Sequence, residues 1–177
     1  GLIYENQSGA LNESIADVFG SLSLQRALGQ EVHQADWLVG RGILGPGING
    51  AALRSMKAPG TAYDDDVLGR DPQPAHMRDY VETTEDNGGV HINSGIPNRA
   101  FHLVALTLGG FAWERAGRIW YRTLAARELP TDADFRTFAA ATVRTAVREY
   151  GGQSEEARAV RAAWAEVGVD SDERPVP

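Results

Sequence analysis

Two carboxylates four residues apart, Glu13 and Asp17, form the first part of the sequence with the composition of a functional site. On an α-helix this spacing places both side chains on one face, opposite the apolar residues Leu11, Ile15, Val18, Phe19 and Leu22. Residues 9–22 contain no Lys or Arg, and the acidic face is flanked by small residues: Gly9, Ala10, Ala16 and Gly20. Like charges at this spacing repel each other. Compensation by a metal ion and its imidazole ligands therefore fits better than the solvated face that most such pairs form.

A second polar cluster surrounds His91, in the glycine-, asparagine- and acid-rich segment 85–95. A single histidine is more often structural than catalytic. A loop position beside glycines, just before the most apolar stretch of the chain, favours function instead. Asp86 is close enough in sequence to orient the imidazole and to stabilise positive charge on it.

The elements that would position these residues are helices. Apolar residues at 3–4 spacing predict five of them, over residues 8–26, 97–108, 111–127, 131–150 and 154–167. Thr131 with Asp134, and Ser154, are expected to cap the last two. Between the first two helices, residues 29–73 are rich in glycine and proline and predict a long ordered loop. No internal repeat and no convincing β-sheet is found, so the predicted fold class is all-α. One domain is expected over residues 1–169, followed by a frayed tail at 170–177.

Composition narrows the classes of partner. The chain of 177 residues has 17 Lys and Arg against 24 Asp and Glu, a net charge of -7, and no two basic residues are adjacent. Nucleic-acid binding needs clustered cations and is therefore not expected. The longest mainly apolar stretch, residues 103–108, is far short of the roughly 20 residues that span a bilayer, so no membrane partner is expected. Cysteine is absent, which excludes disulfides and thiolate chemistry.

Four strings of residues resemble one known family. They are 1–4 (Gly-Leu-Ile-Tyr), 8–17 (Ser-Gly-Ala-Leu-Asn-Glu-Ser-Ile-Ala-Asp), 53–56 (Leu-Arg-Ser-Met) and 86–95 (Asp-Asn-Gly-Gly-Val-His-Ile-Asn-Ser-Gly). In order and spacing they resemble the carboxyl-terminal helical domain of thermolysin-like zinc metallopeptidases, and the resemblance continues to about Val169. It implies hydrolysis of peptide bonds next to bulky hydrophobic residues, a peptide or protein substrate, and a secreted bacterial enzyme.

The resemblance also implies roles for residues of the site. Glu13 resembles the third zinc ligand, and Asp17 the carboxylate that accepts a hydrogen bond from a zinc-bound imidazole. His91 resembles the cationic donor to the tetrahedral oxyanion, with Asp86 as its partner and Tyr4 as a second donor.

A further set resembles the substrate-binding cleft. Arg54 resembles the residue that holds the substrate carbonyl beyond the scissile bond. Leu53, Val39 and Ile43 are expected to line the pocket for a bulky apolar side chain. Asn93 is expected to bond the substrate backbone.

The His-Glu-x-x-His motif, which supplies two zinc ligands and the general base in this family, is absent. The four histidines are His33, His76, His91 and His102, and no two are four residues apart. In the family this motif precedes the stretch that matches 1–4, and this sequence does not begin with methionine. The expectation is a C-terminal domain whose partner is the missing N-terminal domain, and which alone neither holds zinc nor hydrolyses peptides.

Calcium ligands of the family are also sparse. Leu24, Asp36, Arg41 and Ala51 stand where thermolysin itself has acidic calcium ligands, so the calcium sites are expected to be absent. The acidic run 64–66 is interpreted as a solvated loop rather than an ion site. Two alternatives to a peptidase remain at this stage: a non-catalytic peptide-binding domain, and a structural helical bundle in which Glu13 and His91 are incidental.

Overall fold

The protein is described by a computed structural model over residues 1–171. It is built of the α-helices α1 (Asn6–Leu28), α2 (Asp86–Asn93), α3 (Gly95–Leu108), α4 (Ala116–Ala125), α5 (Phe135–Tyr150) and α6 (Glu155–Glu166), with one 3₁₀ turn, η1 (Met77–Asp79). Four two-residue strands are present: β1 (Leu38–Val39), β2 (Arg54–Ser55), β3 (Asp64–Asp65) and β4 (Gly69–Arg70). The prediction of an essentially all-α fold is confirmed. None of the helices within residues 1–171 is long and apolar enough to cross a membrane.

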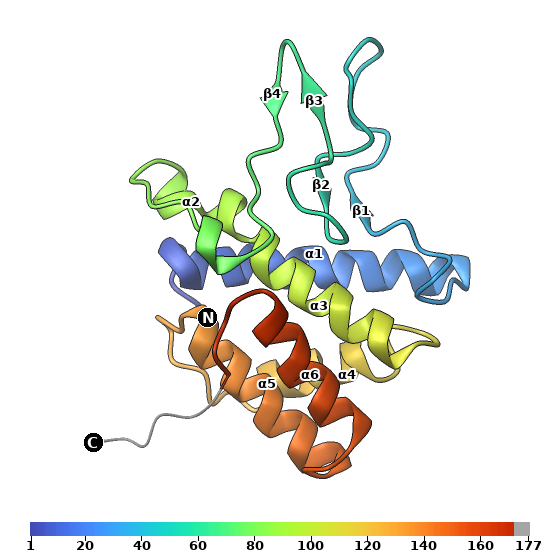
Figure 1. Ribbon diagram of the computed structural model, residues 1–177, viewed down its shortest axis with the longest axis vertical. Helices are drawn as coiled ribbons and strands as arrows, with labels where there is room; N and C mark the ends of the chain where they lie inside the picture. The colour runs from blue at the N-terminus through green and yellow to red at the C-terminus, as the bar shows by residue number, and fades with distance from the viewer. Residues whose placement is uncertain (172–177) are drawn as a thin grey trace.

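The helix α3 crosses the centre of the molecule between α1 and α6 (Figure 1). Its Phe101 is fully buried and meets Trp120 of α4 edge to face, with ring centroids 5.0 Å apart. Trp120 stacks on Trp164 of α6 at 6.2 Å, and Phe138 of α5 packs edge-on against both indoles. Burying side chains of this size contributes about 1.5–3 kcal/mol each. This aromatic cluster therefore fixes α3 to the helices around it.

Helix α1 carries the two carboxylates singled out in the sequence. It ends at Gly29, whose left-handed backbone (φ 63°) allows its N–H to bond the Arg26 carbonyl. Its apolar face is buried as expected, with Leu11 and Val18 completely enclosed. On the acidic face Asp17 is buried, at 5% exposed, whereas the Glu13 side chain is 19% exposed.

The expectation of no β-structure is wrong in detail. The segment predicted as loop holds two antiparallel pairs, β1 with β2 and β3 with β4, which lie beyond α1 at the top of Figure 1. In the first pair Val39 faces Arg54, so this ladder positions a predicted site residue. Each strand has only two residues, too few for an alternating pattern to be read from sequence.

Helices α4 and α5 begin several residues later than predicted. The fourth helix starts at Ala116 rather than at residue 111, because residues 111–115 form turns in which Phe111 stacks on Trp113 at 4.6 Å. Helix α5 is capped by Asp134 alone, which accepts a 2.7 Å bond from the Thr137 amide; Thr131 takes no part. The Ser154 cap of α6 is confirmed.

The chain end was predicted to be a frayed tail from residue 170 onward. Asp170 forms a 2.8 Å ion pair with Arg136. Residues 172–177 of that predicted tail lie outside the described residues.

Candidate active site

Three side chains from separate segments meet at one end of α1. The Tyr4 hydroxyl donates a hydrogen bond to Glu13 Oε1 and lies 3.3 Å from His91 Nε2. His91 Nε2 is in turn 3.4 Å from Glu13 Oε2. The site is open to solvent: the His91 and Glu13 side chains are 50% and 19% exposed, and Tyr4 is 40% exposed. A carboxylate, a phenol and an imidazole thus share one accessible surface.

The hydrogen bond to Glu13 is the main cause of a raised pKa at Tyr4, to about 12, with smaller contributions from burial and from the charges of Glu13 and Asp86. The phenol therefore stays protonated at neutral pH. It remains a hydrogen-bond donor over the whole range in which peptidases normally work.

The imidazole of His91 is held from behind by Asp86. Asp86 Oδ1 lies 2.6 Å from His91 Nδ1, while Asp86 Oδ2 accepts a 2.8 Å bond from the His91 backbone N–H. These two contacts fix the ring so that Nε2 points toward Glu13 and Tyr4. The expected partnership of these two residues is thus present as a contact.

The expectation that His91 lies on a loop is wrong, and the local backbone explains why the sequence suggested one. It lies on the short helix α2, whose start is unusual: Asp86, Asn87, Gly88 and Gly89 all have positive φ (53°, 51°, 82° and 74°). Such residues have left-handed backbone, which Gly tolerates best and Asn or Asp better than most. A Cβ on Gly88 would lie 2.2 Å from Asn6 Oδ1, so glycine there also permits close approach to the start of α1.

Asp17 lies one turn along α1 from Glu13 and is bound by two other elements. Arg54 of β2 donates to it twice, from Nε to Oδ2 at 2.8 Å and from Nη2 to Oδ1 at 2.7 Å. Asn98 of α3 donates from Nδ2 to Oδ2 at 2.9 Å. The hydrogen bonding of Arg54 to Asp17 is also the main cause of a raised pKa at Arg54. Within this chain the compensating charge for Asp17 is thus a guanidinium, where the sequence suggested a metal and imidazoles.

Asn98 was missed in the sequence. Its side chain is completely buried in the most apolar helix. Asn98 could have been found as an amide placed inside a run of apolar residues. Such a side chain is expected to have a specific partner, because buried polar groups are hydrogen-bonded.

The residues expected to bind substrate do not all reach the surface. Leu53 is 37% exposed and lies over Gly40, where a Cβ would come within 2.9 Å of its side chain. Val39 is half-buried beside it, and Ile43 is 65% exposed. Asn93 is fully buried, and its amide bonds both the N–H and the carbonyl of Val81, at 2.9 and 3.0 Å. These two bonds fix the 81–93 segment, and the bonding of a substrate by Asn93 stays a prediction.

Within residues 1–171 no group of three or more His, Cys, Asp or Glu side chains is placed to hold a metal ion. Glu13 fits a metal site as one ligand, because its carboxylate is accessible and faces the shared surface.

In the loop that resembles a calcium region, Asp36 pairs with Arg41 at 3.2 Å. Asp65 accepts backbone N–H groups from Asn49, Val67 and Leu68, which lower its pKa and organise a turn.

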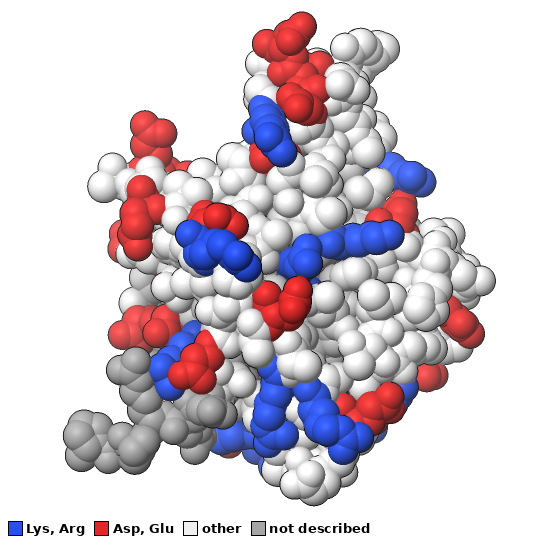
Figure 2. Space-filling view, viewed as in Figure 1, with Lys and Arg blue, Asp and Glu red and all other residues white. Residues whose placement is uncertain are grey.

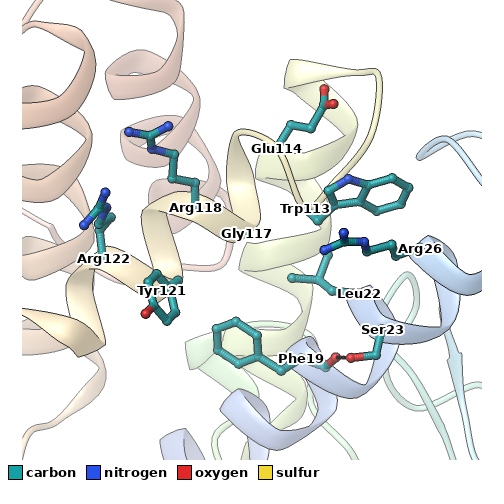
Figure 3. A pocket seen from close by; sticks show the side chains of 10 residues that line it. All are labelled: Phe19, Leu22, Ser23, Arg26, Trp113, Glu114, Gly117, Arg118, Tyr121 and Arg122. Carbon is teal, nitrogen blue, oxygen red and sulfur yellow. Dashed lines mark hydrogen bonds between the residues drawn. The ribbon is translucent and has the colours of Figure 1, made fainter.

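A hollow of about 630 Å³ lies elsewhere, between α1 and α4 (Figure 3). Its α1 residues Phe19, Leu22 and Arg26 are on the side of the helix roughly opposite Glu13 and Asp17, at 100° per residue. A hollow of similar volume, about 640 Å³, is lined by residues of 48–51 and 60–64, so volume alone does not identify a site. On the face in Figure 2, Lys and Arg side chains are interspersed with acidic ones and form no broad basic patch; the absence of a nucleic-acid partner stays a prediction.

The accessible carboxylate, imidazole and phenol form a polar site on a helical domain, and the sequence profile of this domain identifies its class. Residues 1–169 match the sequence profile of the thermolysin metallopeptidase α-helical domain, and the chain belongs to this family. The resemblance seen in the four sequence strings is thereby confirmed.

Particular relatives support the same conclusion. The chain is 58% identical to the extracellular metalloprotease of Pectobacterium carotovorum subsp. carotovorum, over 96% of this chain and 48% of that protein. It is 54% identical to protease PrtS of Photorhabdus sp., over 95% of this chain and 45% of that protein. A solved structure, the precursor of protealysin, a metalloproteinase from Serratia proteamaculans, matches with a TM-score of 0.93 and 62% identity, over 96% of this chain and 52% of that one. The chain thus spans about half the length of these relatives.

Proposed function

We propose that this chain is the C-terminal half of a zinc-dependent metalloendopeptidase that cleaves peptide bonds next to bulky hydrophobic residues. The observation that carries the proposal is the convergence of Tyr4, Glu13 and His91 within 3.4 Å on one accessible surface. Three chemically different groups, a carboxylate, a neutral phenol and an oriented imidazole, are the complement that metal-assisted acyl hydrolysis needs.

In this proposal Glu13 is one zinc ligand, and two imidazoles and a general base come from a part of the protein outside this sequence. Zinc, when bound, supplies Lewis acidity and lowers the pKa of coordinated water. A catalytic zinc site typically has three protein ligands. We therefore expect the chain alone to be inactive and to hold no zinc stoichiometrically, and we propose the absent N-terminal domain as its partner.

His91 and Tyr4 would stabilise the oxyanion that forms when water attacks the scissile carbonyl. His91 donates from Nε2, since Asp86 occupies Nδ1. Tyr4 donates from its hydroxyl, which lies 3.3 Å from His91 Nε2 and therefore faces the same position. Fixed donors aimed at developing charge are worth about 10²–10³ in turnover each.

Substrate binding is assigned to the edge formed by β1 and β2. Arg54 uses Nε and Nη2 to hold Asp17, which leaves Nη1 to donate to a substrate carbonyl. Leu53, Val39 and Ile43 lie on the same strands or in the loop between them and would receive a bulky apolar side chain. The names of the relatives, extracellular metalloprotease among them, support a secreted bacterial enzyme with a peptide or protein substrate.

The test is made on the longer protein encoded by the gene. Hydrolysis of a quenched peptide with Leu or Phe after the scissile bond is measured beside zinc content, for the wild type and for Glu13→Ala. Glu166→Ala, an exposed carboxylate on α6, is the matched control. The proposal is supported if Glu13→Ala loses zinc and activity while Glu166→Ala keeps both. A wild-type protein that binds such peptides without cleaving them would instead establish the non-catalytic peptide-binding alternative.

A further inference from the structure

Asp17 has an uneven distribution of hydrogen bonds between its two oxygens. Oδ2 accepts two, from Arg54 Nε at 2.8 Å and from Asn98 Nδ2 at 2.9 Å. Oδ1 accepts one, from Arg54 Nη2 at 2.7 Å. A carboxylate oxygen has two lone-pair sites. Oδ2 is therefore saturated, and Oδ1 keeps one site open.

The orientation of the Asn98 amide is set by this carboxylate. If the amide were rotated by half a turn, its carbonyl oxygen would face Asp17 Oδ2, and two acceptors would repel each other. The amide therefore keeps its NH₂ group toward Asp17 although its own Oδ1 is buried without a hydrogen-bond partner in the described part of the chain. A buried acceptor left unpaired costs about 1–3 kcal/mol. Asn98 thus serves the position of Asp17 at the expense of its own hydrogen bonding.

We propose that Asn98 is a positioning residue that reserves Asp17 Oδ1 as the acceptor for an incoming imidazole. The inference rests on the proposed function, in which Asp17 accepts a hydrogen bond from a zinc-bound histidine supplied by the rest of the protein. Arg54 alone holds the carboxylate by two bonds from one side. Asn98, which comes from α3, adds a third bond from a different element and restrains rotation of the carboxylate about its last side-chain bond.

Arg54 and Asn98 therefore have different roles at Asp17. Arg54 supplies the compensating charge and two hydrogen bonds, and Asn98 supplies the third bond, which helps to fix the orientation of the carboxylate. Loss of Asn98 leaves the charge pair intact but removes one of the three bonds that restrain the carboxylate and frees an acceptor site on Oδ2. An imidazole bonded to a less restrained acceptor is less well oriented toward a metal, and loss of such supporting bonds typically weakens metal binding about 10–100-fold.

The experiment compares Asn98→Leu and Asn98→Ser with Gln25→Met in the longer protein. Gln25 is the matched control: it is a buried amide, 2% exposed, and among residues 1–171 its Oε1 is equally unpaired and its side chain bonds only Ser21. Zinc retention is measured against a graded chelator, together with kcat and KM. Asn98→Ser is included because it is small enough to be tolerated if leucine prevents folding, yet too short to reach Asp17.

Both Asn98 variants are expected to release zinc at about 10–100-fold lower chelator concentration, while Gln25→Met matches the wild type. A second readout needs no metal: exchange of the Arg54 Nε–H proton in zinc-free protein should be faster in the Asn98 variants, because Asp17 is less restrained. Unchanged zinc retention and unchanged exchange in Asn98→Ser would overturn the inference, as would an equal zinc loss in Gln25→Met. A wild type without zinc or activity contradicts the proposed function, and the Arg54 exchange then decides the role of Asn98 separately.

Discussion

The Tyr4 hydroxyl touches both Glu13 and His91: it donates to the Glu13 carboxylate and lies 3.3 Å from His91 Nε2. The phenol therefore stands between the group proposed to bind a metal and the group proposed to bind an oxyanion. A carboxylate that coordinates a cation is a poorer hydrogen-bond acceptor. Metal binding by Glu13 would thus free the Tyr4 hydroxyl for the oxyanion, and the contact couples the two roles.

In the longer protein, His91→Ala should lower kcat and kcat/KM together by about 10²–10³ while zinc content is unchanged. The physical reason is that His91 is assigned to charge that develops only in the transition state. Kinetics and zinc quantification on the same preparation measure this, with exposed His33→Ala as the control. Loss of zinc in His91→Ala would mean that the imidazole, and not Glu13 alone, helps to hold the metal.

Tyr4→Phe should reduce kcat by about 10², with little change in KM, because it removes one donor and no substrate contact. The same variant tests whether the pKa of Tyr4 is raised. In the zinc-free wild type, where Glu13 still accepts from Tyr4, absorbance of the phenolate should include a tyrosine that titrates near pH 12, and this step should disappear in Tyr4→Phe. Titration of Tyr4 near pH 10, the ordinary value, would show that its bond to Glu13 does not persist in solution.

The buried His102 predicts an acid-sensitive fold. Burial, aided by Lys57 and Arg99, lowers its pKa from 6.5 to about 4. The ring centroid lies 4.9 Å from that of Trp37, and Nδ1 has no hydrogen-bond partner among the residues that the structure describes. A histidine whose pKa is depressed on folding stabilises the native state above its unfolded pKa, and this stability is lost as pH falls. The free energy of unfolding should therefore fall between about pH 6.5 and 4, by up to about 3 kcal/mol.

Urea unfolding at several pH values measures this effect. The His102→Gln variant should show a flatter dependence than the wild type, because no imidazole remains to be protonated. His33→Gln, which alters an exposed histidine, should keep the wild-type slope. A wild-type slope in His102→Gln would place the acid sensitivity elsewhere in the chain.

Much of this architecture follows from sequence patterns, and the exceptions have physical reasons. The long periodic stretch of α1 and the Ser154 cap were predicted because helix period and capping act locally. The helix α2 was missed because its first four residues are left-handed, a conformation that composition indicates only as glycine-rich loop. Asn98 and the buried state of Asn93 were missed because their partners, Asp17 and Val81, are set by tertiary contacts. The contact of Glu13 with His91 joins residues far apart in sequence; only family resemblance suggested it.

The approach of α1 to α2 gives a prediction that separates position from chemistry. At Gly9 a Cβ would lie 2.4 Å from Val90 Cγ1 and 3.0 Å from the Tyr4 backbone carbon. Gly9→Ala must therefore push α2 away from α1, although it alters no group that takes part in the proposed reaction. Overpacking of this kind typically costs about 1–3 kcal/mol. Because Val90 is next to His91, the shift should also move the imidazole away from Glu13.

Gly20→Ala is the matched control on the same helix, since a Cβ there meets nothing within 4 Å. Alanine in place of an interior helical glycine should raise stability by about 0.5–1 kcal/mol. Thermal unfolding and kcat/KM of both variants in the longer protein measure the contrast. Gly9→Ala should lose stability and turnover together, and Gly20→Ala should gain stability with turnover unchanged. A Gly9→Ala protein with wild-type turnover would mean that catalysis tolerates displacement of His91 relative to Glu13, and the 3.4 Å contact between them would then carry no weight in the mechanism.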